Sequence, residues 1–282
     1  MQKKVHAISW LLILAVTAVF AAGTKENAAS QKVSVTNYTF GGSSTVAPIV
    51  EAAIEPFEAK NPDMKVSYET LGSSVGLKGL MAGTLSLAGS SRELKADEVS
   101  AGLVPTTIAL DGLSVAVHGD VGVSNLTMAQ LASLFAGEIS NWKELGGNDE
   151  AVHLIVRDET SGTYGSFKEI VLDKAKKVPS KDAIVAKENG ELAAKVASNP
   201  GSVGYIGMAF GQIVTSAGGR VLTIDGVTPN ATNVKNGSYP ISRALYLVTK
   251  GEPQGGEKRF VDYLLSADGQ SLVGEAGFIP VN

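Results

Sequence analysis

The sequence contains no cysteine, and it has only two tryptophans and three histidines in 282 residues. Without cysteine the chain can form no disulfide, no thiolate metal site, no thiol nucleophile and no lipid-modified cysteine. Its net charge is −4 at pH 7 and no basic stripe interrupts it, so the electrostatic footprint of a nucleic-acid-binding protein is missing. The acidic residues do not follow metal-loop spacing. The composition therefore indicates neither a metal nor a cofactor, and it excludes thiol chemistry and nucleic acid as a partner.

The N-terminus has the features of an export signal. Lys3 and Lys4 precede an apolar run at 8–20 that is short for a membrane span, and small residues follow it. We expect a signal peptide at 1–23, then a small, polar and flexible leader at 24–36. The alternative of an uncleaved anchor stays open. Export implies a periplasmic or cell-surface location.

Strand-like and helix-like segments alternate along the rest of the chain, which favours an α/β fold. With 44% hydrophobic residues the chain can bury a sizeable core, and its length favours two lobes. A turn is expected at Asp111-Gly112, between two buried strands. We expect strands at 33–40, 64–70, 85–88, 104–110, 113–117, 152–156, 203–208, 220–224 and 244–249, and helices at 46–60, 75–82, 95–101, 128–136, 162–172, 188–198 and 255–265.

Three segments share one pattern, in which a predicted strand ends, a Ser/Thr/Gly turn follows and a helix begins. They are 42–45, 72–74 and 160–163. A helix N-terminus exposes unsatisfied N–H groups with positive partial charge, and hydroxyl groups add further donors. Each segment taken alone is better explained by ordinary helix capping than by a ligand. Three of them converging would surround a small tetrahedral anion.

Arg157 lies at the end of a predicted strand, four residues before Ser161. Its forked guanidinium suits oxyanions. The alternative is a surface ion pair with Asp158 or Glu159. Together with the serine-rich helix starts, the arginine predicts a site for a tetrahedral oxyanion.

Several motifs in order carry a family resemblance, which runs from about residue 38 to the C-terminus. The chain resembles the phosphate-binding protein of the high-affinity phosphate ABC importer. The motifs are GSSTVAP at 42–48, LGSSVGLK at 71–78, AGSSREL at 88–94, EISNW at 138–142, RDETSGT at 157–163, Tyr239-Pro240 and GFIP at 277–280.

This resemblance implies a type II periplasmic-binding-protein fold, with two α/β lobes joined by two crossing strands and a ligand cleft between them. The first lobe would comprise 37–113 plus 243–282, and the second 114–242. Inorganic phosphate would be the ligand, a membrane permease of an ABC importer the partner, and the protein a monomer. By position, the family's ligand contacts fall on Ser44, Thr45, Ser73, Arg157, Ser161, Gly162 and Thr163, with Ser43 beside them.

One position departs from the family pattern. Where many members carry an aspartate that accepts the proton of hydrogen phosphate, this chain has Ser91, whose hydroxyl can also donate. Asp111 and Glu159 are candidates to take over that role or, instead, to orient Arg157. Arg92 follows Ser91 directly and is a further candidate ligand contact, with a surface role as its alternative.

Two other functions stay open at this stage. Ser91 makes a binding protein for sulfate or molybdate a real alternative. A phosphate-ester hydrolase is the less favoured one, because the chain has neither a Gly-x-Ser-x-Gly elbow nor a phosphate-binding P-loop. Its two histidines beyond the signal, His118 and His153, are better explained as ends of buried strands than as catalytic bases.

Overall fold

The computed structural model describes residues 34–282. The predicted signal peptide at 1–23 and most of the predicted leader at 24–36 lie outside the described residues. Within 34–282, no helix combines the length and the apolar character needed to cross a membrane.

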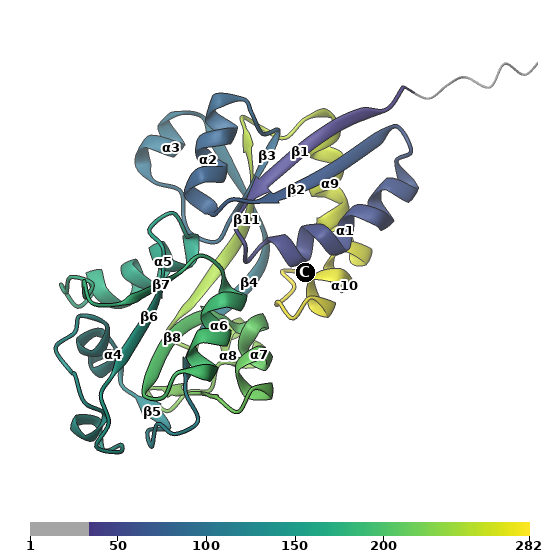
Figure 1. Ribbon diagram of the computed structural model, residues 1–282. Helices are drawn as coiled ribbons and strands as arrows, with labels where there is room; N and C mark the ends of the chain where they lie inside the picture. Colours follow the sequence, from purple (N-terminus) through teal and green to yellow (C-terminus); the bar gives the residue numbers. More distant parts are fainter. Residues whose placement is uncertain (1–33) are drawn as a thin grey trace, which may run out of the picture. The chain divides into compact units, whose positions relative to one another are not determined.

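The main sheet of the described chain has nine strands, and its first half has the strand order β2-β1-β3-β11-β4 (Figure 1). The first three strands along the chain run parallel to each other, whereas β11 is antiparallel to both of its neighbours. The strands are β1 (Thr36–Gly42), β2 (Met64–Thr70), β3 (Leu87–Ser90), β4 (Leu103–Val117) and β11 (Ser242–Lys250).

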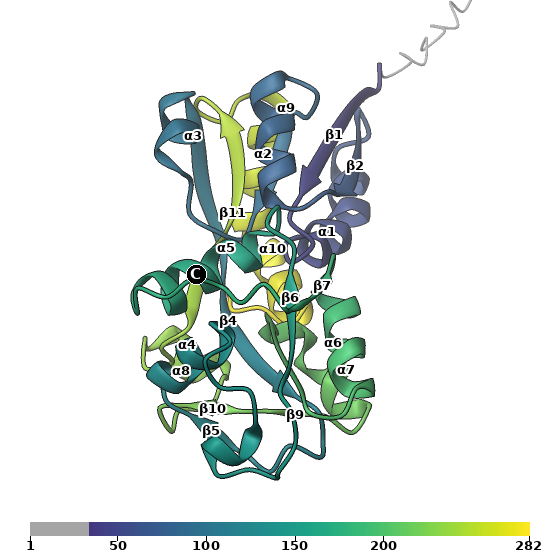
Figure 2. The same cartoon turned by 60° about the vertical axis from the view of Figure 1, so that its left-hand side comes forward.

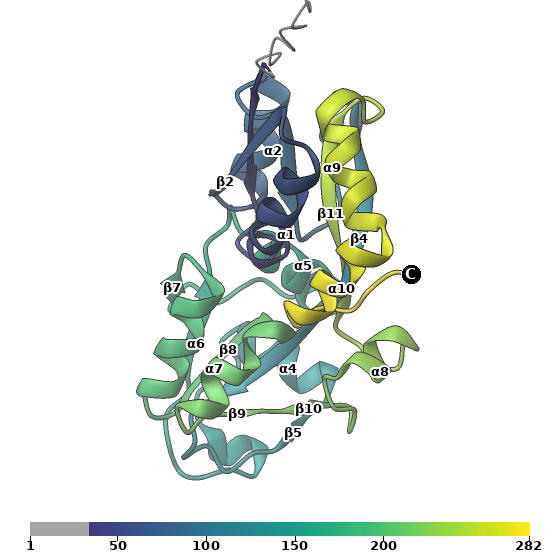
Figure 3. The ribbon, with the colours of Figure 1, turned by 90° about the vertical axis from the view of Figure 1, so that its right-hand side faces the viewer.

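Helices cover both faces of this sheet. Successive side chains of a strand point to opposite faces, so each face has its own set of side chains against which helices pack. On β11, Leu245 and Leu247 join one buried cluster, while Tyr246 and Val248 join another. Figure 3 shows α9 running beside β4 and β11. The helices of this half are α1 (Ala47–Lys60), α9 (Gly255–Leu265) and α10 (Ala267–Glu275), and α2 (Ser73–Ala82) with α3 (Ala96–Ser100).

The sheet continues into a second half through the long strand β4 (Figure 2). The strand order of this half is β4-β8-β6-β7. The strands β6, β7 and β8 are parallel, and β8 is antiparallel to β4. A short strand, β9, also pairs with β4, while β5 and β10 pair separately. The bounds are β5 (Asn125–Leu126), β6 (His153–Arg157), β7 (Ile184–Ala186), β8 (Ser202–Gly207), β9 (Arg220–Val221) and β10 (Thr223–Ile224).

An aromatic group lies in the core of this second half. The rings of Phe167 and Tyr205 stack with their centroids 3.8 Å apart, and Phe135 meets both edge-on. The helices of this half are α4 (Met128–Phe135), α5 (Gly162–Phe167), the π-helical η2 (Lys168–Asp173), α6 (Asn189–Ser198), α7 (Gly211–Ser216) and α8 (Ala231–Lys235), with 3₁₀ turns η1 (Trp142–Leu145) and η3 (Met208–Phe210).

The mixed α/β fold is confirmed, but the turn expected at Asp111-Gly112 is wrong. β4 runs through both residues as one strand of 15 residues. The aspartate is satisfied by Arg243 on the paired strand, so it needs no solvent. The glycine serves packing, since a Cβ there would lie 2.9 Å from Val234 of α8.

Two further expectations needed correction. The predicted helix at 162–172 divides into α5 and the wider π-helical η2, and the predicted strand at 220–224 divides into β9 and β10. The short helices α7, α8 and α10 were not expected.

Candidate ligand-binding site

The predicted site residues follow the carboxyl ends of parallel strands, the edge at which open α/β sheets bind ligands. In the first half, β1 leads into 43–45, β2 into Ser73, and β3 into Ser91. In the second half, β6 ends at Arg157 and leads into 161–163. The topology therefore brings residues from four distant segments to one place.

A buried serine cluster forms on the first half. Ser43 Oγ donates to Ser91 Oγ over 2.9 Å, and the N–H of Ser91 donates to Ser73 Oγ over 3.1 Å. The three residues are at most 2% exposed. Ser91 is thus a central member of this cluster, as its place in the sequence motif suggested.

Residues of the second half meet this cluster directly. Thr45 Oγ1 and Thr163 Oγ1 are 3.1 Å apart. Gly162 lies so close to two serines that a Cβ added there would be 2.3 Å from Ser73 Oγ and 2.5 Å from Ser91 Oγ. Only glycine lets the backbone at the start of α5 approach the serine cluster this closely.

The serine hydroxyls also cap helices, so the capping interpretation and the anion interpretation are compatible. Ser161 Oγ accepts from the N–H groups of Thr163 and Tyr164, over 3.1 and 3.4 Å. In the turn before α1, Ser43 Oγ likewise accepts from the N–H of Thr45 over 3.1 Å. A cap uses the lone pairs of the oxygen, so the hydroxyl proton of Ser161 stays free to be donated, whereas that of Ser43 is already given to Ser91.

Arg157 is buried at the end of β6, and the alternative of a surface ion pair is wrong for it. Its Nε donates to the carbonyl of Ala186, and its Nη2 donates to Ser44 Oγ over 3.1 Å and to the carbonyl of Lys187. Among residues 34–282, Arg157 Nη1 is the one buried side-chain nitrogen or oxygen without a hydrogen-bond partner. A buried donor without a partner is costly, which indicates that the site is built for an acceptor.

The electrostatic surroundings of Arg157 fit this interpretation. Burial lowers its pKa to about 10; the negative charge of Asp158 opposes the shift, and the positive charge of Arg243 adds to it. An anion bound between these two guanidinium groups would relieve both the burial and the repulsion.

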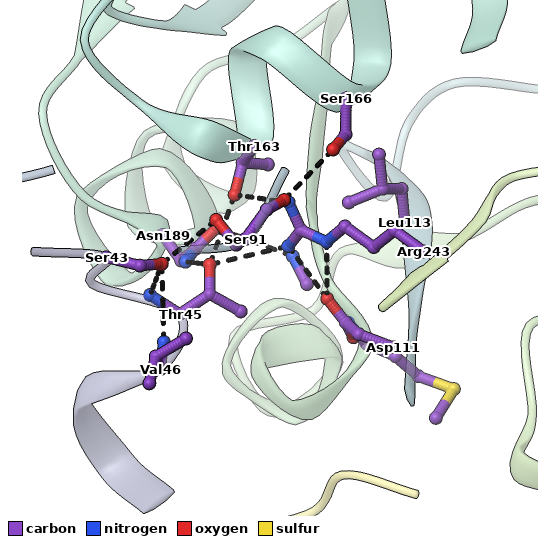
Figure 4. Close-up of polar contacts among 12 residues, drawn as sticks. Ser43, Thr45, Val46, Ser91, Asp111, Leu113, Thr163, Ser166, Asn189 and Arg243 are labelled. Atoms are coloured by element: carbon purple, nitrogen blue, oxygen red, sulfur yellow. Dashed lines mark hydrogen bonds and ion pairs between the residues drawn. The ribbon is translucent and has the colours of Figure 1, made fainter. Parts of the chain in front are cut away.

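Arg243, at the start of β11, is a central residue that the sequence did not reveal. Its Nε and Nη2 donate to Asp111 Oδ2 over 3.0 and 2.7 Å, and it is only 8% exposed (Figure 4). Burial raises the pKa of Asp111 and lowers that of Arg243, while each charge stabilises the other. Asp111 therefore orients Arg243, not Arg157 as one alternative had it.

Asn189, the first residue of α6, was also missed. Its Nδ2 donates to Thr45 Oγ1 over 2.9 Å, and its Oδ1 accepts from the N–H of Gly207. A signal for Asn189 was available in principle, because it lies in the first turn of the helix predicted at 188–198.

The remaining two candidates lie apart from the serine cluster. Arg92 forms a buried bidentate pair with Glu98, over 2.7 and 2.8 Å, and its Nη2 donates to Ser74 Oγ. Glu159 is exposed. The described geometry thus commits the guanidinium of Arg92 to a carboxylate, and it leaves Glu159 outside the buried group.

The sequence and the fold both match known proteins. The sequence profile of the family described as the PBP superfamily domain matches residues 26–268 of this chain. The chain is 34% identical to the phosphate-binding protein PstS of Borreliella burgdorferi, over 86% of this chain and 89% of that one, and 37% identical to PstS of Bacillus subtilis, over 86% and 80%.

A solved structure gives the same relation. A putative phosphate ABC transporter substrate-binding protein from Clostridium perfringens, crystallised with bound phosphate, has a TM-score of 0.81 and 33% identity to this chain, covering 88% of this chain and all of the other. These likenesses span nearly the whole described fold. The chain therefore belongs to the PBP superfamily and, within it, to the family of the phosphate-binding proteins PstS.

Proposed function

We propose that this protein captures inorganic phosphate between the two halves of its sheet. The observations that carry the proposal are the buried hydroxyl groups of both halves, which contact one another, and the buried guanidinium of Arg157, whose Nη1 has no partner within 34–282. The names of the related proteins support the same ligand. The ligand contacts would be those of the sequence prediction without Arg92 and Asp111: Ser43, Ser44, Thr45, Ser73, Ser91, Arg157, Ser161, Gly162 and Thr163.

The binding would serve transport, with the loaded protein delivering phosphate to the membrane permease of an ABC importer from outside the cytoplasm. Two lobes, 37–113 plus 243–282 and 114–242, would close on the ligand and open to release it. The separate hydrophobic clusters around Phe40 and around Trp142 support this division, because each half has its own core. We expect the protein to act as a monomer and without catalysis.

Sulfate remains the second candidate ligand, because Ser91 is a hydroxyl where an obligate acceptor would penalise a fully ionised anion. Asp111 is not free to replace that acceptor, because both of its carboxylate oxygens already accept hydrogen bonds. Its Oδ2 is used by two N–H groups of Arg243, and its Oδ1 accepts from the N–H of Met208.

Calorimetric titration of the chain from residue 34 onward tests the proposal. We expect one phosphate per chain and weaker binding of sulfate, measured at pH 6 and pH 8. Sulfate binding as tight as phosphate binding would overturn the assignment of phosphate. An assay with a chromogenic phosphate ester should show no turnover, and steady release of phosphate from it would favour the hydrolase.

A further inference from the structure

All five N–H groups of Arg243 are directed to protein acceptors. Nε and Nη2 donate to Asp111 Oδ2, and Nη2 also lies 3.4 Å from Thr45 Oγ1. Nη1 donates over 3.0 Å to both the carbonyl of Ser91 and Thr163 Oγ1. Because arginine has no further N–H to offer, it acts on a ligand through these neighbours.

Thr45 is the first of these neighbours. Its Oγ1 receives Nδ2 of Asn189 over 2.9 Å and Nη2 of Arg243. A hydroxyl oxygen has two lone pairs, so these two donors occupy both of them. The hydroxyl of Thr45 can then act only as a donor.

Thr163, from the other half of the sheet, is the second neighbour. Its Oγ1 accepts from Nη1 of Arg243 and lies 3.1 Å from Thr45 Oγ1 (Figure 4). Since Thr45 must donate, it can fill the remaining lone pair of Thr163, and the proton of Thr163 is then directed elsewhere.

We infer that Arg243 is a positioning residue that, together with Thr45, fixes the hydroxyl of Thr163 as a hydrogen-bond donor toward the captured anion. This inference rests on the proposed function. Asp111 holds the guanidinium in the orientation required, through two N–H bonds to one oxygen. Arg243 also links the halves, because Thr45 precedes α1 and Thr163 lies in α5.

A thermodynamic cycle on phosphate affinity tests this role. Thr163→Val removes the hydroxyl while keeping the shape of the side chain. In the wild-type background we expect it to weaken binding at least ~10-fold, as for a hydrogen bond to a charged group. In an Asp111→Asn/Arg243→Met background, where the hydroxyl is free to turn, the same substitution should cost about 3-fold or less.

The paired replacement is chosen because removing both partners of a buried ion pair leaves no uncompensated charge. Arg259→Met/Asp63→Asn is the matched control, since it removes an exposed arginine–aspartate pair, and it should leave both the affinity and the Thr163→Val effect unchanged. Equal losses from Thr163→Val in both backgrounds would overturn the inference while leaving the proposed function intact. A wild-type protein that does not bind phosphate would overturn both.

Arg243→Lys provides a second measurement, which remains available if the paired variant does not fold. An ammonium keeps the charge beside Asp111 but lacks the planar fork that reaches Thr45 and Thr163 together. We expect an unchanged thermal midpoint of the ligand-free protein to within about 3 °C, with phosphate affinity reduced ~10-fold or more. Wild-type affinity in this variant would contradict the positioning role.

Discussion

In the proposed site, Arg157 explains how a chain with a net charge of −4 can hold an anion. Its buried guanidinium contacts the hydroxyl of Ser44, and its Nε and Nη2 donate to carbonyl oxygens at the end of β7. Local donors outweigh the net charge, because interactions inside a low-dielectric site are stronger than those across solvent. The long-range field of the protein is screened within about 10 Å at moderate salt.

Replacing Arg157 with methionine should weaken phosphate binding roughly 10- to 100-fold, the value of a hydrogen bond between charged groups. The unfolding temperature of the ligand-free protein should stay the same or rise, because folding no longer has to remove a charged guanidinium from water. Calorimetry and a thermal melt measure the two effects. Arg220→Met is the control, since the side chain of Arg220 donates to the carbonyl of Val123 away from the serine cluster.

The pH dependence of binding follows from the same arginine. Burial lowers the pKa of Arg157 to about 10, and a bound anion would raise it again. Affinity should therefore be constant between pH 8 and 9, where phosphate stays a dianion, and should fall as the pH rises through about 10. Titrations across this range check the prediction, and a flat profile up to pH 11 would contradict the role of Arg157 as the positive group.

The role of Arg243 could not be predicted from the residues around it in the sequence. Ser73 and Thr163 were predicted because hydroxyls before helices form a repeated pattern, and Ser91 because it lies in a family motif. An arginine at the start of a strand has no such pattern. Its place next to Asp111 depends on β11 pairing with β4 across 132 positions of sequence.

At the scale of elements, the start of α5 has no room for an added side-chain atom. The backbone of Gly162 fits against Ser73 and Ser91, and Ser74 donates its N–H to the carbonyl of Thr160 over 3.0 Å. The start of α5 is therefore packed directly against the serine cluster.

Gly162→Ala tests this fit. The added methyl would lie 2.3 Å from Ser73 Oγ, so we expect phosphate affinity to fall at least ~100-fold while the folded state survives with the halves apart. Gly190→Ala in α6 is the matched control, because a Cβ there meets nothing within 4 Å. Native-like binding by Gly162→Ala would show that the start of α5 can move without loss.

Elements were predicted well where periodicity was strong, and poorly where tertiary contacts decide. The helix expected at 46–60 and the strand expected at 64–70 match α1 and β2 within one residue. The turn expected at Asp111 failed because an aspartate followed by glycine is typical of a turn, and only the partner strand shows that the carboxylate is neutralised inside the sheet.

At the scale of the whole molecule, ligand binding should be visible as stability. A ligand at 100 times its dissociation constant adds about 2.7 kcal/mol to the free energy of unfolding. For a chain of this size that corresponds to a rise of about 5–10 °C in Tm. Thermal melts with phosphate, with sodium chloride of equal ionic strength as the control, measure it.

Closure of the two halves should be visible as compaction. If they open without ligand, small-angle scattering will give a smaller radius of gyration with phosphate than without it. Arg157→Met, measured at the same phosphate concentration, should keep the larger radius. An identical radius in all three samples would contradict closure by hinge motion.

The position of β11 has a consequence for the order in which the protein can assemble. It lies between β3 and β4, yet it comes from residues 242–250, after the whole second half has been made. The second half is contiguous in the chain and can fold as it emerges, whereas the first half lacks a central strand until the last forty or so residues follow. A chain that ends near residue 240 would lack β11. Its first half, although synthesised first, could therefore not complete its sheet.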